Sequence, residues 1–174
     1  MKLQLTNSIA DFKWRFHNYP VNQMFGMHSM AAALLMNQHS VSEVKDAEAY
    51  ISRMNGLTVL FDQLIENLQV RADKGIIAPK FVYPYVINDS QNIIKGAPFD
   101  DGKDSTLLAD FSKKVNALEI TDEQKTGLID DGKKALINHV KPAYEKLIGY
   151  LGNLEKRATT DDGAWKFPDG KAFY

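Results

Sequence analysis

The chain has 174 residues, of which 44% are hydrophobic and 25% charged, and its formal net charge is −1. These values are typical of one globular domain and argue against a disordered protein. The 21 basic and 22 acidic residues are mixed along the chain, which argues against a nucleic-acid-binding surface, and the lack of cysteine excludes disulfides, thiol catalysis and cysteine-rich zinc sites. The longest apolar run near the start, residues 30–36, is far shorter than the ~20 residues of a membrane-spanning helix, so we expect no membrane span.

The N-terminal segment, residues 1–28, is predicted to be irregular, because Tyr19-Pro20 and Gly26 interrupt it. Aromatic and charged or polar residues alternate over 12–16, a spacing typical of a short strand. We expect the aromatic side chains of this segment to pack on the helices that follow. They are Phe12, Trp14, Phe16, Tyr19 and Phe25.

The rest of the chain predicts an all-α fold, a bundle of about six helices. The first covers residues 29–37, and the second begins at the N-cap Ser42 and stops at Asn55-Gly56. The third, residues 57–74, has the clearest helical periodicity, with one apolar face and the basic Arg71 near its C-terminal end. The apolar residues of that face are Leu57, Leu60, Phe61, Leu64, Ile65, Leu68 and Ala72.

Three further helices follow at residues 84–95, 107–118 and 121–151. The last begins with a capping box, in which Thr121 is the N-cap and Gln124 the N3 residue. Pro142 lies inside this helix and is expected to kink it. From residue 159 the helical periodicity ends, and turn sequences dominate.

The histidines and acidic pairs do not form a recognisable catalytic or metal motif. His17, His28 and His39 are predicted to be ordinary surface or capping residues, and His139 a partly buried residue in the stripe of the long helix. No His-Glu-x-x-His sequence occurs. We therefore predict no catalytic residue, no metal ligand and no cofactor in this chain.

Aromatic residues in the two irregular segments are the candidates for a cleft or a partner surface. Residues 165–174 combine aromatic side chains with a Pro-Asp-Gly turn, and loops of this kind often line ligand clefts. The alternative is that these aromatic side chains pack onto the helices. The candidate surface consists of Tyr19, Asn22, Phe25, Trp165 and Tyr174.

Several short motifs occur in an order and at spacings similar to those of a bacterial family, the domain of unknown function 885 family. They are Tyr19-Pro20-x-Asn22-x-x-x-Gly26, Asp46-Ala47-x-x-Tyr50-Ile51, Gly75-x-x-x-Pro79, Pro142-Ala143-Tyr144 and Gly163-x-Trp165-x-x-Pro168-Asp169-Gly170-x-x-x-Tyr174. The match runs from about Tyr19 to the last residue. The resemblance implies a long, mostly helical bacterial protein, often exported to the periplasm or anchored as a lipoprotein.

The family also resembles zinc metallopeptidases of the gluzincin type. The resemblance implies a zinc site with a His-Glu pair, a second histidine on the same helix and a glutamate downstream, where a metal-activated water would hydrolyse peptides. This chain has no His-Glu dipeptide. We therefore expect residues 1–174 to be one helical domain and a fragment of a longer zinc-dependent peptidase, in which it forms a non-catalytic scaffold along the substrate cleft.

The expected partners are the remainder of the parent polypeptide and, in the full-length protein, zinc and a peptide substrate. The alternative is a standalone helical binding module with an aromatic recognition surface. If the chain is a fragment, it should expose an apolar patch that normally meets the missing part, and it could form a homodimer through that patch.

Overall fold

The structure is a computed structural model that describes residues 2–173. Within this range all the secondary-structure elements are helices, and none is a strand. The predicted all-α fold is therefore confirmed. In chain order the elements are α1 (Lys2–Asp11), the 3-10 turn η1 (Phe12–Trp14), α2 (Met27–Gln38), α3 (Val44–Asp73), α4 (Val82–Ile93), α5 (Thr106–Asn116), α6 (Asp122–Ala135), the π-helical segment η2 (Leu136–Val140), α7 (Lys141–Arg157), η3 (Ala164–Lys166) and α8 (Gly170–Phe173).

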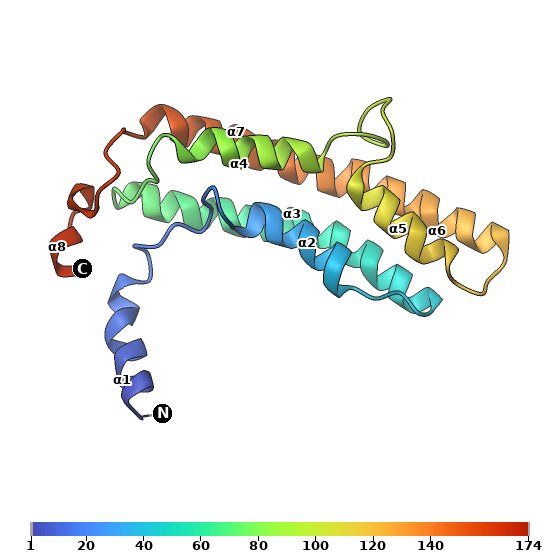
Figure 1. Ribbon diagram of the computed structural model, residues 1–174, viewed down its shortest axis with the longest axis horizontal. Helices are drawn as coiled ribbons and strands as arrows, with labels where there is room; N and C mark the ends of the chain where they lie inside the picture. Colours follow the sequence, from blue (N-terminus) through green and yellow to red (C-terminus); the bar gives the residue numbers. More distant parts are fainter. Residues whose placement is uncertain (1, 174) are drawn as a thin grey trace.

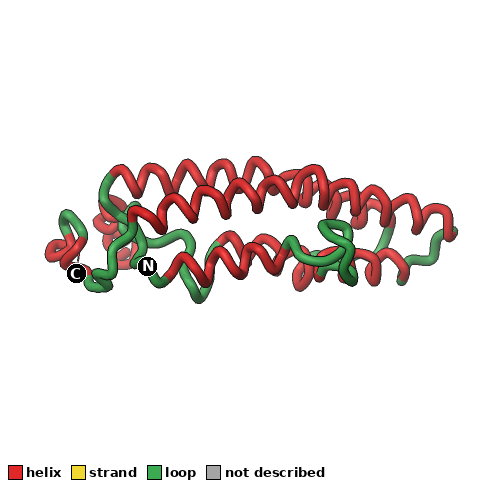
Figure 2. Tube along the Cα trace, turned by 90° about the horizontal axis from the view of Figure 1, so that it is seen from above, coloured by secondary structure: helices red, strands yellow, loops and turns green. Residues whose placement is uncertain are grey.

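The bundle is elongated, and two long helical rods run along it (Figures 1 and 2). One rod is α3, and the other is the continuous run of α6, η2 and α7, which packs against α3. Helices α4 and α5 follow one another along the second rod, and α2 contacts both of them as well as α3. Helix α1 extends away from the bundle, and α8 lies at the same end of the molecule (Figure 1).

Two expected helices are one, because α3 runs without a break from Val44 to Asp73. The predicted stop at Asn55-Gly56 is wrong. A glycine inside a helix costs about 1 kcal/mol relative to alanine. The buried side chains of Met54, Leu57 and Phe61 lie on the same face on both sides of that glycine, and burial of this face offsets the cost.

Other local predictions differ from the structure in smaller ways. The N-cap of α3 is Glu43 instead of Ser42, because Glu43 and Asp46 form a reciprocal capping box. The predicted strand at residues 12–16 is wrong. There the backbone N–H of Arg15 donates to the carbonyl of Phe12 at 3.2 Å, which closes a turn.

The start of the chain's longest helical run follows the prediction more closely. Thr121 and Gln124 form the predicted capping box, with hydrogen bonds of 3.1 and 3.3 Å. Pro142 lies inside this continuous helical run, where it lacks the N–H that would donate to the preceding turn, and the residues before it adopt the wider π-helical turn η2.

The core lies between α3 and the α6–α7 rod. The rings of Phe61 and Tyr144 meet edge to face with centroids 4.8 Å apart, and both side chains are fully buried. The Tyr144 hydroxyl donates to the carbonyl of His28 at 2.6 Å, and burial raises the pKa of that hydroxyl. At the other end of α2, Lys114 donates to the carbonyls of Leu35 and Met36, so that α5 and α7 together fix the position of α2.

Gly132→Ala is expected to destabilise the fold by about 1–3 kcal/mol, because it overfills the contact between α6 and α5. A Cβ atom at Gly132 would lie 2.6 Å from Cε1 of Phe111, whose side chain is fully buried. Gly127→Ala in the same helix is the matched control: no atom lies within 4 Å of its Cβ position, so we expect stabilisation by about 0.5–1 kcal/mol. Urea denaturation of both variants measures the difference, and equal stabilities would contradict the packing argument.

Candidate interaction site

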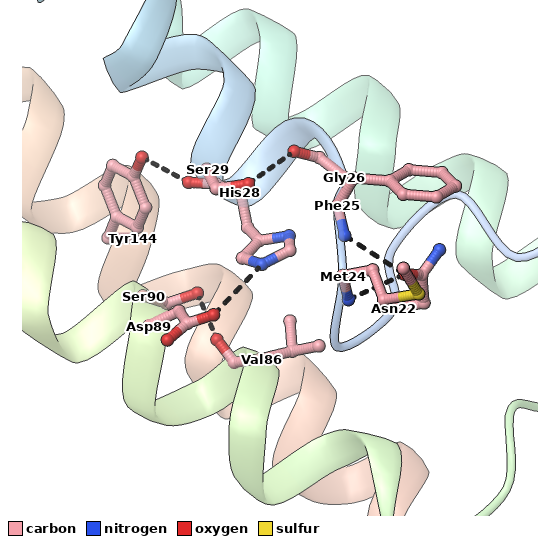
Figure 3. A network of polar contacts seen from close by, with 10 residues as sticks. All are labelled: Asn22, Met24, Phe25, Gly26, His28, Ser29, Val86, Asp89, Ser90 and Tyr144. Carbon is pink, nitrogen blue, oxygen red and sulfur yellow. Dashed lines mark hydrogen bonds and ion pairs between the residues drawn. The ribbon is translucent and has the colours of Figure 1, made fainter.

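A tight turn before α2 presents two apolar side chains to the outside. The Asn22 Oδ1 atom accepts hydrogen bonds from the backbone N–H groups of Met24 at 2.9 Å and Phe25 at 3.1 Å. The Asn22 N–H donates to the carbonyl of Phe25 at 3.0 Å, which closes the turn. Figure 3 shows the two bonds that Asn22 Oδ1 accepts. As a result Met24 is exposed, and Phe25 retains 59% exposure.

Gly26 connects this turn to α2 and can only be glycine. Its φ is 157°, and a Cβ atom there would lie 2.8 Å from the Cα of Val21 and 2.9 Å from the carbonyl oxygen of Pro20. Both contacts are with backbone atoms, which cannot rotate away as a side chain can. The glycine therefore allows the loop to fold back closely against the start of α2.

Arg71 of α3 holds the loop that precedes this turn. Its Nε donates to the carbonyl of Asn18 at 3.1 Å, and its Nη2 donates to the carbonyl of Arg15 at 3.2 Å and to Asn18 Oδ1 at 2.9 Å. Its Nη1 donates to the carbonyl and the side-chain oxygen of Asn67. Arg71 is only 7% exposed and has no carboxylate partner among residues 2–173.

Two adjoining hollows between α2, α3 and the loop form one groove, which we call the α2–α3 groove. The larger hollow has a volume of about 670 Å³ and the smaller one about 410 Å³, and the two share Met27, Met30 and Leu60. The groove is lined on α2 by Met27, Met30, Ala31, Ala33, Leu34, Leu35, Asn37 and Gln38, on α3 by Arg53, Gly56, Leu57, Leu60, Gln63, Leu64, Asn67 and Arg71, and in the loop by Asn18, Tyr19, Pro20, Phe25 and Gly26.

Helix α2 is apolar on both its inner and its outer face. Its inner residues Ala32 and Leu35 are buried in the core, whereas Met30 and Leu34 on the outer side are 54% and 50% exposed. A helix that is hydrophobic on all sides is usually covered on all sides. The outer face of α2 is therefore an exposed apolar surface of the kind that marks a protein interaction site.

His28 lies in the first turn of α2 and faces α4. The prediction of a surface histidine is wrong here: the side chain is buried, and burial lowers its pKa. Its Nε2 lies 4.0 Å from Oδ2 of Asp89 on α4, and its Nδ1 has no hydrogen-bond partner among the described residues (Figure 3). His28 thus belongs to the packing between α2, α4 and α7.

The described residues contain no group of three or more histidine, cysteine, aspartate or glutamate side chains that could hold a metal ion. The predicted partial burial of His139 agrees with the structure. The ring of His39 is engaged by other groups: its Nε2 lies 2.9 Å from the Asp46 carbonyl oxygen, and its Nδ1 lies 2.6 Å from Nη1 of Arg53. None of the helices within residues 2–173 is both long and apolar enough to cross a membrane.

The structure brings together only some of the residues predicted to form a recognition surface. Tyr19 and Phe25 line the α2–α3 groove, and Asn22 shapes the turn that carries Phe25. Trp165 is 79% exposed in η3 and lines neither hollow, and Tyr174 lies outside the described residues.

Sequence reasoning missed the part of the C-terminal segment that contacts this region. The buried Phe167 packs its ring against Tyr19, with centroids 5.9 Å apart. Sequence reasoning also did not identify most residues of the groove, including Met30, Leu34 and Arg53. The signal that could have shown the groove is the run of apolar residues around the whole of α2.

Comparison with known proteins supports one assignment. The family described as "Bacterial protein of unknown function (DUF885)" matches residues 1–174. No curated protein matches the chain. A crystal structure described as "the putative lipoprotein from Colwellia psychrerythraea" has a TM-score of 0.82 and 23% sequence identity to this chain, and the match covers 90% of this chain and 26% of that one. The likeness shows a shared helical fold, and this chain spans about a quarter of the length of that protein. Since the family match extends over every residue, the chain belongs to the DUF885 family of bacterial proteins.

Proposed function

We propose that residues 1–174 are a non-catalytic helical scaffold in a longer DUF885 protein, and that the α2–α3 groove seats a further segment of that polypeptide. The observation that carries the proposal is the exposed apolar face of α2, with Met30 and Leu34 each at least half exposed beside Leu60. The length of the Colwellia protein supports it, because 74% of that chain lies outside the part that resembles this fold, the match covering 26%.

The proposal extends to the reaction of the longer protein, which we infer to be a zinc-dependent peptidase with this chain along its substrate cleft. This inference rests on the family's resemblance to gluzincin metallopeptidases. The described residues of this chain do not fit a zinc ion, because His28 is buried beside Asp89 and both ring nitrogens of His39 are engaged. The zinc ligands would therefore come from sequence outside residues 1–174. Export to the periplasm or lipid anchoring is part of the same proposal.

The 174-residue chain is expected to bind no stoichiometric zinc and to cleave no peptides, whereas the longer protein is expected to do both. Elemental analysis after dialysis against a zinc-containing buffer measures the metal, and a quenched fluorescent peptide library measures cleavage. Tight binding of one zinc ion per chain, or zinc-dependent peptide cleavage by the isolated chain, would contradict the scaffold assignment. A longer protein without zinc or cleavage would contradict the peptidase assignment alone.

A standalone binding module is the second candidate, and the position of Tyr19 and Phe25 in one hollow favours it. Both side chains could stack on an aromatic or apolar ligand beside Gln63 and Asn67. The gene sequence downstream of residue 174 separates the two candidates. A reading frame that continues into a His-Glu motif supports the scaffold, and a stop codon directly after residue 174 supports the module.

A further inference from the structure

The N-terminal and C-terminal segments pack together at one end of the bundle, where α1 and α8 lie (Figure 1). The ring of Phe167 lies 5.9 Å from that of Tyr19 and 6.3 Å from that of His17, measured between centroids. Beside this contact is a pocket of about 440 Å³, a size typical of small-molecule sites. We call it the terminal pocket, and it shares no lining residue with the α2–α3 groove.

The walls of the terminal pocket are aromatic and apolar. They are formed by Trp14 and Phe16 of the N-terminal segment, Ile76 directly after α3, and Pro168 near the end of the chain. Trp14 and Phe16 are half-buried, and Ile76 is buried. Three segments that are far apart in the sequence therefore build one lining, against which a flat apolar group can pack.

Positive charge is in excess in this pocket. Its basic residues are Lys13, Arg15 and Lys74, and Asp169 is the one carboxylate among the described residues of its lining. The guanidinium carbon of Arg15 lies 4.6 Å from the centroid of the Phe16 ring, and Nζ of Lys74 lies 5.6 Å from it. None of the ion pairs between described side chains involves any of these four charged residues. The pocket thus places cations directly beside an aromatic wall.

The donors of these cations are largely unused by the protein itself. Arg15 forms one side-chain hydrogen bond, from Nη1 to the carbonyl of Phe12 at 3.1 Å, and the side chains of Lys13 and Lys74 form none within the described residues. The buried Arg71 differs, because its donors are all directed at oxygen atoms of the loop and of α3. A guanidinium and two ammonium groups with unused donors are well suited to binding a carboxylate.

We propose that the terminal pocket binds a small carboxylate that carries an aromatic group, the combination found in an N-acylated aromatic amino acid or the free C-terminal residue of a peptide. The carboxylate pairs with Arg15 and Lys74, and the aromatic group packs on Trp14 and Phe16. A bare inorganic anion would leave the apolar walls uncovered, and a neutral aromatic compound would leave the cations without a counter-charge.

The test uses the whole 174-residue chain and the fluorescence of Trp14. The chain has two tryptophans, and Trp165→Phe removes the signal of the exposed one. N-acetylphenylalanine, its neutral amide and inorganic phosphate are titrated at low salt, with excitation at a wavelength that phenylalanine does not absorb. We expect a saturable change with the acid in the millimolar range, at least about fivefold weaker binding of the amide, and no saturation with phosphate. Added salt should reduce the difference between the acid and the amide.

Three substitutions at exposed positions locate the ligand. Lys74→Gln removes one cation of the pocket and should weaken binding of the acid about threefold without changing binding of the amide. Asp169→Asn removes the carboxylate of the lining and should strengthen binding of the acid about twofold. Lys80→Gln is the matched control, because it changes the net charge equally at a lysine outside the pocket, and it should leave binding unchanged.

Equal binding of the acid and the amide, binding of phosphate as tight as that of the acid, or no response to any of the three compounds would overturn the inference. So would a Lys74→Gln chain that binds the acid as tightly as the Lys80→Gln chain, because the ligand would then lie outside the terminal pocket. The titrations contain no metal ion, and the inference rests on neither the α2–α3 groove nor the peptidase assignment, so its failure would leave both of those proposals unchanged.

Discussion

Phe61→Ala is expected to lower the free energy of unfolding by about 3–5 kcal/mol, the range for truncating a buried phenylalanine. Phe61 lies in the middle of α3, is fully buried and meets the Tyr144 ring edge to face at 4.8 Å. The truncation would leave a cavity between the two long helical rods, where the rigid helices limit how far the walls can close. Urea denaturation followed by circular dichroism measures the change.

Phe81→Ala is the matched control for this prediction, because Phe81 is about half exposed at the N-cap of α4. We expect it to cost less than about 1 kcal/mol. If both alanine variants lost similar stability, the contact between α3 and α7 would not be the centre of the fold.

Arg71→Met is expected to destabilise the chain by about 2–4 kcal/mol and to release the N-terminal loop from α3. The substitution keeps much of the apolar stem but removes all five donor bonds, including those to the carbonyls of Arg15 and Asn18. The N-terminal loop would then lose the donor that ties it to α3. Denaturation measures the stability, and limited proteolysis measures the release, with faster cleavage expected between residues 15 and 26.

Arg53→Met provides the comparison, since Arg53 lies on the same face of α3 but is exposed. It should change stability by less than about 0.5 kcal/mol and leave the proteolysis pattern unchanged. An Arg71→Met chain as stable and as resistant to protease as Arg53→Met would show that the loop is held by other contacts.

Helices could be predicted correctly where the sequence showed a one-sided apolar spacing or a capping motif. The capping box at Thr121 and Gln124 marked the start of α6, and the apolar spacing around Phe61 marked the centre of α3. The break predicted at Gly56 did not occur. The low helix propensity of glycine acts only at that position, and it is outweighed by burial of the apolar face that continues on both sides of Gly56.

The candidate site was less predictable, because it depends on contacts between distant segments. Tyr19 and Phe25 were identified as aromatic residues in an irregular segment, and both line the groove. The role of Arg71 was not foreseen: at the end of an isolated helix it interacts with the helix dipole, whereas in the fold it binds a loop 53 residues earlier in the chain. The groove itself requires α2 to lie beside α3, which no local pattern specifies.

A single thiol at position 34 tests directly whether another segment of a longer polypeptide covers the outer face of α2, as we propose. The chain has no cysteine, so Leu34→Cys introduces a unique reactive group at an exposed groove position. In the 174-residue chain we expect maleimide labelling at nearly the rate of the unfolded protein. In the full-length gene product we expect labelling at least about tenfold slower, because the seated segment shields the thiol. Equal labelling rates in the two proteins would contradict the account.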